Sequence, residues 1–269
     1  MEILLKALLV PLVIGLASLA SRRFGHGVAG VLAGFPIVAA PVTLMLVLEL
    51  EPERIADIAS ATLASLPASI GFIVSFAWLS RRGPWWLCLA GATSAFAALG
   101  GLVAALEPLS LSSEVVRIPL RVLLPLAAPM IGLLLMPAPA ATAPVAVRVP
   151  PGEILVRMGV GLTMGLALLL LAGQVSPAFS GLLLTWPVAG SVLPSFTAAL
   201  HGHRATVLLL RGFAKGLTGF ALFFLSLALL TRAGVPALGA FGVAVAMPVV
   251  VAALLHRIGR APTLDAPPR

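Results

Sequence analysis

Two cations inside an apolar run carry the clearest chemical signal in this sequence. Arg211 and Lys215 are four residues apart, so they share one face of a helix. If this helix begins near residue 208, Lys215 lies about 10 Å along it, where a charge in a membrane needs a partner or a water-filled cavity. Because the run from 208 to 231 contains no Asp or Glu, we expect an anionic ligand. The alternative is a helix that begins near Gly212, with both side chains reaching the cytoplasmic surface.

A proline break that occurs twice supplies the second signal. The segments GVLAGFP, at 30–36, and GLLLTWP, at 181–187, each lie mid-way along an apolar run of about 20 residues, the length of a membrane helix. Proline frees the carbonyl four residues before it, and a bilayer tolerates freed carbonyls only where protein or water receives them. Paired breaks in corresponding helices therefore predict a transport site near the middle of the membrane.

Both signals define the predicted substrate site. An aromatic ring precedes each proline and the second run adds hydroxyl groups, so the site would offer polar atoms and apolar surface to a solute. The predicted substrate-binding residues are Phe35, Pro36, Thr185, Trp186, Pro187, Ser191, Arg211 and Lys215. The alternative is kinked packing without a solute, because prolines and small residues are common in membrane helices.

The composition is that of an integral membrane protein. Hydrophobic residues make up 60% of the 269 residues and charged residues 10%, which leaves too little polar surface for a water-soluble globule. The net charge of +8 comes from Lys and Arg scattered over short loops, which argues against nucleic-acid binding. Cys88 is the only cysteine, so no internal disulfide forms. The sequence contains no catalytic motif, and we expect no enzymatic activity, cofactor or metal site.

Nine apolar runs are long enough to be transmembrane helices, and they form a repeat. Glu2, Gly30 and Pro36 each find an identical residue 151 positions later, without a gap. Five runs separate the starts of the two copies, and an odd number reverses the second copy in the membrane. We therefore expect an all-α, polytopic membrane protein built as a 4+1+4 inverted repeat. The runs lie at about 3–20, 27–48, 58–79, 84–105, 117–136, 153–172, 178–200, 208–231 and 236–255.

The repeat also predicts the domains. They are a first four-helix repeat at 1–105, a linker with the fifth helix at 106–150, a second, inverted repeat at 151–258 and a cytoplasmic tail at 259–269. Ten Lys and Arg residues near the ends of the runs fall on one predicted side and five on the other. The positive-inside rule then places the C-terminus in the cytoplasm and the N-terminus in the periplasm, across a bacterial inner membrane.

Polar residues at the ends of the runs are expected to be structural. Glu153 precedes Arg157 by four residues, which predicts a surface ion pair that fixes the first turn of a helix, and the same spacing opens the first repeat. His201 and His203 have no carboxylate or cysteine near them in the sequence, so we expect no metal there. His26 is expected at the membrane interface.

Three segments of the first half resemble a known family. GVLAGFPIVAAPVTL, RIADIASATLASLP and FAWLSRRG occur in the order and spacing seen in the small four-helix GlpM-like membrane proteins. The resemblance covers roughly residues 1 to 105, and 153 to 256 more loosely; it implies a four-helix fold and no site residues. The layout is also similar to fused small-multidrug and drug/metabolite transporters. The first helix lacks their deep acidic residue, so the likeness does not imply proton-coupled cation export.

These observations favour transport. We expect an inner-membrane secondary transporter or flippase that moves an amphipathic or anionic small molecule by alternating access, at a midplane site between two inverted repeats. The lipid bilayer and the small molecule are its expected partners, and a homodimer stays open. The alternatives are a non-transporting structural or assembly subunit of a membrane complex, and a channel.

Overall fold

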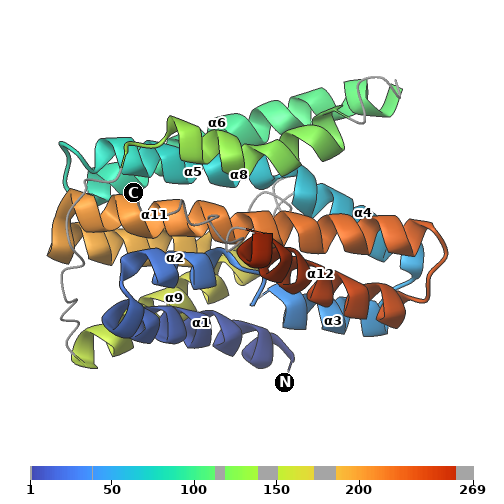
Figure 1. Ribbon diagram of the computed structural model, residues 1–269, viewed down its shortest axis with the longest axis horizontal. Helices are drawn as coiled ribbons and strands as arrows, with labels where there is room; N and C mark the ends of the chain where they lie inside the picture. The colour runs from blue at the N-terminus through green and yellow to red at the C-terminus, as the bar shows by residue number, and fades with distance from the viewer. Residues whose placement is uncertain (1, 38, 113–118, 139–150, 173–185, 259–269) are drawn as a thin grey trace, which may run out of the picture.

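The protein is a bundle of helices (Figure 1). The computed structural model describes residues 2–37, 39–112, 119–138, 151–172 and 186–258, which contain no β-strand. The all-α prediction is therefore confirmed for the described part of the chain.

Residues 2–49 form three helices whose ends follow from glycine and proline. Helix α1, Glu2–Phe24, stops before Gly25, whose φ of 85° lies in the left-handed region that favours glycine. Helix α2, His26–Gly34, ends because the residue before a proline avoids helical angles: Phe35 is extended, with ψ of 154°, and Pro36 follows it. The chain resumes as α3, Ala39–Glu49.

Residues 52–135 form a helical hairpin, followed by a short helical turn and one further helix. Helix α4, Pro52–Ala64, begins with a proline in its first turn and continues after a bend as α5, Leu66–Leu79. Helix α6, Trp85–Ser112, returns along α5. A π-helical turn η1, Pro119–Leu123, leads into α8, Leu124–Leu135.

The last part begins with α9, Pro151–Ala172, and ends with α11, Val188–Arg232, and α12, Ala237–Ile258. Helix α11 is a hairpin and not one rod, because Gly202 has non-helical angles, φ 74° and ψ −174°. A Cβ added to Gly190 would lie 3.0 Å from Phe213 Cζ, although 23 positions would separate these residues by about 34 Å in a straight helix. The arm 188–201 therefore folds back on the arm 203–232, as Figure 1 shows.

Helix α2 lies directly against the second arm of α11, with backbone touching backbone. A Cβ on Gly30 would overlap the carbonyl oxygen of Leu209, and one on Gly34 would overlap that of Phe213. The fit is mutual, because a Cβ on Gly212 or Gly216 would overlap carbonyl oxygens of α2. Glycines spaced four apart on both helices permit this approach, as in other membrane helix pairs.

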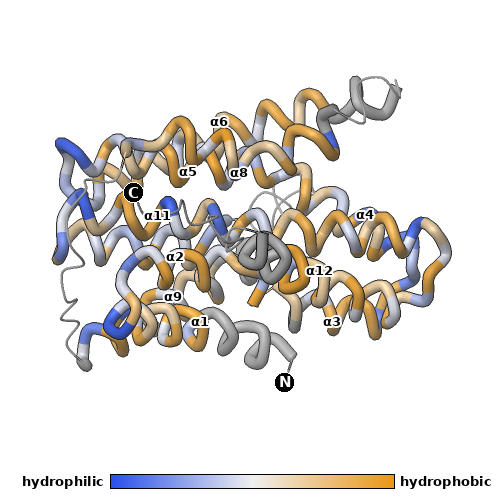
Figure 2. The backbone as a smooth tube through the Cα atoms, in the orientation of Figure 1, coloured by the Kyte–Doolittle hydropathy of each residue, from blue (hydrophilic) through white to orange (hydrophobic). Residues whose placement is uncertain are grey.

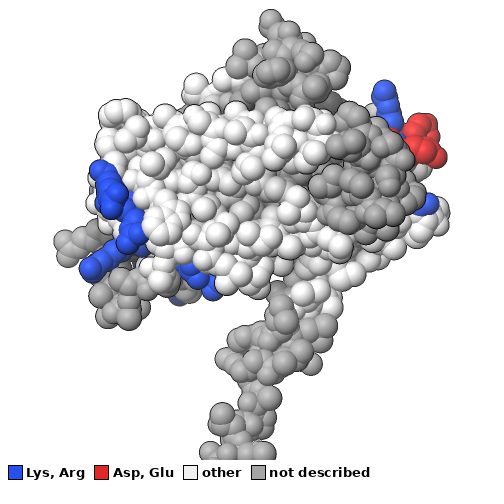
Figure 3. Space-filling model, turned by 90° about the horizontal axis from the view of Figure 1, so that it is seen from above, with Lys and Arg blue, Asp and Glu red and all other residues white. Residues whose placement is uncertain are grey.

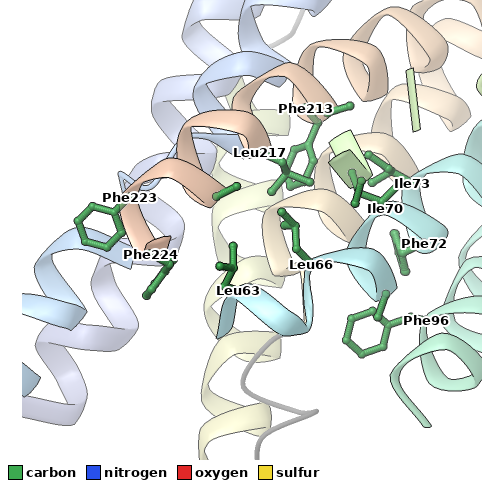
Figure 4. Close-up of a cluster of buried hydrophobic side chains, with 14 of the residues drawn as sticks. Leu63, Leu66, Ile70, Phe72, Ile73, Phe96, Phe213, Leu217, Phe223 and Phe224 are labelled. Atoms are coloured by element: carbon green, nitrogen blue, oxygen red, sulfur yellow. The ribbon is translucent and has the colours of Figure 1, made fainter. Parts of the chain in front are cut away.

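The main core forms where α4, α5 and α6 pack on α11. Figure 4 shows leucine, isoleucine and phenylalanine side chains from these helices pointing toward one another. A second, smaller cluster joins α1 and α2 to both arms of α11. The labelled residues of the main core are Leu63, Leu66, Ile70, Phe72, Ile73, Phe96, Phe213, Leu217, Phe223 and Phe224.

Polar residues gather at the two ends of the bundle (Figures 2 and 3). One end carries arginines, and the opposite end carries acidic residues with two arginines among them. The apolar middle separates these ends, as expected for a protein that crosses a membrane. The basic end, joined by the His26–His201 ring contact and the Ser80–His203 hydrogen bond, includes Arg22, Arg23, Arg81, Arg82, Arg157 and Arg204. The opposite end, joined by the Asp57–Arg232 ion pair, includes Glu49, Glu51, Glu53, Arg54, Asp57 and Arg232.

Three described helical segments are long and apolar enough to cross a membrane: Pro52–Leu79, Trp85–Leu106 and Val188–Arg232. The bundle is thus compatible with a membrane protein. The arrangement of nine spans as an inverted repeat stays a prediction, because the expected fifth and seventh spans lie partly outside the described residues.

Candidate functional site

The first proline break has the predicted position. Residues 35–37 interrupt the apolar run between α2 and α3, and the amide of Ala40 bonds to the carbonyl of Pro36 at 2.8 Å as α3 begins. The ring of Phe35 lies on α11: a Cβ on Gly219 would be 2.6 Å from Phe35 Cε2. Pro248 of α12 borders the same glycine. The break is therefore enclosed by the second arm of α11 and by α12.

The second break lies at the start of α11. Trp186 and Pro187 are not helical, and the helix begins at Val188. The indole ring of Trp186 is held between Phe72 of α5 and Phe96 of α6, each 5.2 Å away between ring centroids and close to perpendicular. Its Nε1–H is buried without a hydrogen-bond partner among the described residues. Thr185 and the preceding helix lie outside the described residues.

Both breaks come together at Phe213 of α11. Gly34, the last residue before the first break, abuts the carbonyl of Phe213, and Gly190, three residues after Pro187, abuts its ring. A Cβ on Gly190 would also lie 3.1 Å from Pro187 Cβ. Phe213 therefore lies beside the last helical residue before the first break and beside the first helical turn after the second, about 150 positions apart in the sequence.

The hydroxyl groups after the second break bond to their own helix. Ser191 Oγ donates to the carbonyl of Val188 at 2.8 Å and lies 3.3 Å from Met164 Sδ of α9. Ser195 and Thr197 donate to carbonyls one turn earlier, at 2.7 and 2.8 Å. All three residues are buried, so the conformation described here holds these hydroxyls in a dry interface.

Arg211 binds the end of another helix. Its Nη1 donates to the carbonyl of Leu133 at 2.9 Å and to that of Pro137 at 3.4 Å. The last carbonyls of a helix lack partners within that helix, and a cation also suits the negative end of its dipole. Trp78 Nε1 donates to a third carbonyl there, that of Leu135, at 2.8 Å. The partner of Arg211 is therefore the C-terminus of α8.

Lys215 is exposed and lies near the middle of the second arm of α11. The arm begins right after Gly202, so both predicted starts, near residue 208 and near Gly212, are too late. Lys215 is thus about 20 Å from the bend, measured along the helix axis. It forms no hydrogen bond or ion pair with any other described residue. A charge inside a membrane needs a partner or contact with water.

The ion pair of Arg157 and Glu153 forms as predicted, one turn apart in α9, but it is not on the surface. Only 2% of the Arg157 side chain is exposed, and its guanidinium lies 5.4 Å from the ring centroid of Phe196. The expectation of a surface pair is wrong because α1 and the first arm of α11 cover this face of α9, which spacing within one helix does not reveal.

His26, expected at the interface, lies beside His201, one of the two histidines for which no metal was expected. The rings of His26 and His201 are 5.0 Å apart, and Ser21 Oγ lies 3.1 Å from His26 Nδ1. His26 stands at the bend between the first two apolar runs. Its burial, and then the neighbouring His201 and Arg157, lower the pKa of His26 from its usual 6.5 to about 4, so the ring is neutral at pH 7. Among the described residues, no group of three metal-ligating side chains is present.

The glycines of α11 were not among the predicted site residues, although they fix the geometry of the site. Gly212, Gly216 and Gly219 form one stripe along the helix, and this spacing is visible in the sequence. A second stripe with spacings of three and four residues, Gly27, Gly30 and Gly34, occurs in the run that contains the first break. The presence of two such glycine stripes is the sequence signal that predicts a close contact between these helices.

We found no family description, curated protein or solved structure that matches this chain.

Proposed function

We propose that this chain is a bacterial inner-membrane secondary transporter or flippase, whose two halves are inverted repeats that alternate between two packings around the paired breaks. The observation that carries the proposal is the meeting of both breaks at Phe213. In transporters of inverted-repeat type, broken helices from the two halves adjoin the substrate at mid-membrane.

The packing of α1 against α9 supports the inverted repeat. These helices begin the two copies, and they run in opposite directions along one another (Figure 1). A Cβ on Gly15 would lie 3.0 Å from Met158 Sδ, which puts the middle of α1 beside the first turns of α9. A two-fold axis in the membrane plane relates the two copies of an inverted repeat, so equivalent helices of the two copies run in opposite directions. The relation to the GlpM-like proteins is part of this proposal.

The cargo we propose is an anionic or amphipathic small molecule. The support is now Lys215 more than Arg211, because Arg211 binds the carbonyls of α8 and Lys215 has no partner among the described residues. An anionic solute or a second copy of this chain could neutralise it. We propose no enzymatic activity.

The dense packing around the breaks favours one rival, a structural or assembly subunit without transport. A Cβ on Gly190 would lie 3.0 Å from the ring of Phe213, and one on Gly34 would overlap the carbonyl oxygen of Phe213. A transporter in a closed conformation would have the same dense packing, so only a measurement of transport distinguishes it from a structural subunit. A channel would differ from both by conducting ions without counter-transport.

Transport by the purified protein in liposomes decides between these functions. Two anionic probes are suitable: radiolabelled inorganic phosphate, and a short-chain phosphatidylglycerol with a fluorophore that dithionite bleaches from outside. We expect one probe to cross faster than in protein-free liposomes, and Lys215→Ala to slow it at least five-fold. The matched control is Arg232→Ala, which removes an exposed cation from the end of the same helix. Rates equal to those of empty liposomes for both probes would favour the structural subunit.

A further inference from the structure

A polar cluster lies at the basic end of the bundle, where two helix bends meet α9. Ser21 and His26 flank the bend at Gly25, His201 precedes the bend at Gly202, and Arg157 comes from α9. We call these four residues the joint cluster. Their proximity is shown by the 5.0 Å between the two histidine rings and by the charge of Arg157 acting on His26. Three separate segments of the chain therefore direct polar side chains into one place.

The joint cluster holds buried polar atoms that have no hydrogen-bond partner in the described chain, and the arginine nitrogens among them are donors. Arg157 Nε and His201 Nδ1 are buried and have no hydrogen-bond partner there. Arg22, next to Ser21 in the chain, likewise has buried and unpartnered Nε and Nη2 atoms. Buried polar groups are almost always hydrogen-bonded in folded proteins, so unpartnered ones call for an explanation. A guanidinium can only donate, which means that the missing partner is an acceptor.

The charge balance selects an anion as that acceptor. Glu153 neutralises one cation, Arg157, while Arg22 has no acidic partner among the described residues. His26 is neutral at pH 7 and adds no charge to this balance. Arg23, next to Arg22 in the chain, and Arg81, whose charge acts on His203 beside the bend at Gly202, lie at the same end of the bundle. A neutral ligand would leave this excess of positive charge in place.

We propose that the joint cluster binds a phosphate group. A tetrahedral phosphate accepts hydrogen bonds from several directions, which suits donors that come from three segments, and guanidinium groups are preferred phosphate partners. The group could belong to a phospholipid headgroup or to a phosphate in solution, because this end of the bundle lies where the membrane is expected to meet water. The inference goes beyond the proposed function, since a bound phosphate would connect the two bends even in a protein that transports nothing.

Binding to the full-length protein in a maltoside detergent, which contains no phosphate, tests this site. One arm titrates inorganic phosphate against chloride at equal ionic strength, and the other compares phosphatidylglycerol with diacylglycerol, each followed by native mass spectrometry and by the melting temperature. We expect one saturable equivalent in at least one arm. Binding of free phosphate would identify a soluble ligand, and binding of phosphatidylglycerol alone would identify a headgroup; either supports the site.

The variants show whether the joint cluster is responsible. The double variant Glu153→Gln, Arg157→Gln removes both charges of the pair, so no buried carboxylate is left alone, and we expect it to weaken binding about ten-fold or more. His201→Ala should weaken binding as well, and it keeps the test valid if the double variant fails to fold. Arg204→Gln is the matched control, because it removes an exposed cation from the same end. Its affinity should stay within about two-fold of the wild type.

Three results would overturn the proposal. They are the absence of saturable binding in both arms, wild-type affinity in the double variant and in His201→Ala, and a loss in Arg204→Gln as large as in the double variant. The last result would show a general attraction to the basic end instead of a built site. A failure here leaves the transport proposal untouched, because that proposal depends on the breaks at the other end of α2.

Discussion

The two ends of α2 differ in how their contacts are made. At its C-terminal end the helix presses glycine against the backbone of α11, and the break that follows is enclosed by Gly219 and Pro248. At its N-terminal end, eight residues earlier, His26 begins a cluster that contains buried polar atoms without a hydrogen-bond partner among the described residues. The first end is complete and tolerates no added atom, while the second has polar groups left for a ligand. One short helix thus connects a close backbone contact to a cluster of buried polar atoms that lack hydrogen-bond partners among the described residues.

Adding one methyl group at the dry end should have the largest effect. We expect Gly216→Ala to destabilise the protein by about 3 kcal/mol or to prevent its folding, because the new Cβ would overlap the carbonyl oxygen of Val31 and lie 2.8 Å from the carbonyl carbon of Gly34, and neither backbone can move freely. Gly101→Ala is the control, since no heavy atom lies within 4 Å of a Cβ there, and helix propensity then favours alanine. Thermal unfolding in detergent measures both. Equal stability of the two variants would show that the helices are not in backbone contact.

Breaking the buried ion pair at the polar end should come next. Arg157→Gln leaves Glu153 as a nearly buried carboxylate without its cation, and we expect a loss of about 2 kcal/mol in the free energy of unfolding. The double variant with Glu153→Gln should recover part of that loss, because the uncompensated charge is gone. Denaturant unfolding of the four members of this cycle provides the comparison. A double variant less stable than either single variant would mean that the pair is not buried as described.

Substitutions of the two cations of α11 should affect different properties, stability for Arg211 and transport for Lys215. Arg211→Ala removes two hydrogen bonds to the end of α8, so we expect a loss of about 1 kcal/mol in stability. Lys215→Ala should leave stability unchanged and reduce only the transport of an anionic probe. Melting temperatures and liposome rates, measured on the same preparations, test this pair. The assignment fails if Lys215→Ala melts lower than Arg211→Ala.

The smallest effect expected is a pH dependence of stability at the polar end. Because the pKa of His26 is about 4 in the folded protein and near 6.5 in the unfolded chain, the unfolded chain binds the proton more readily. The stability that this residue provides is present above pH 6.5 and is lost as the pH falls from 6.5 toward 4. The melting temperature should therefore drop between pH 7 and pH 5, and less so in His26→Gln. An equal drop in both proteins would assign the titration to another group.

The sequence predicted the local breaks but not their partners. Pro36 acts through its own peptide bond and that of Phe35, so its break could be placed from the sequence alone, and so could the turn near Gly202. The neighbours of Arg157 and Arg211 depend on where other helices end. A spacing of four residues shows that Arg157 can reach Glu153, but only the three-dimensional packing shows that Phe196 covers it.

Glycine is the most informative case of what was missed. Within an apolar run, the sequence alone does not distinguish a glycine that faces lipid from one that contacts another backbone. Gly101 has open space around it, whereas Gly212 has none. Only the pairing of two helices distinguishes them, and such a pairing is a property of the whole fold.

Access to Ser191 from the two sides of the membrane tests the central claim most directly. Ser191 is buried beside the second break, and Cys88→Ala would give a cysteine-free background for Ser191→Cys. In inside-out and right-side-out vesicles, alternating access predicts that a membrane-impermeant maleimide modifies this cysteine from both sides, while Arg204→Cys reacts from one side only. A cysteine at 191 that stays unreactive from both sides, or reacts from only one, would contradict transport by alternation around the paired breaks.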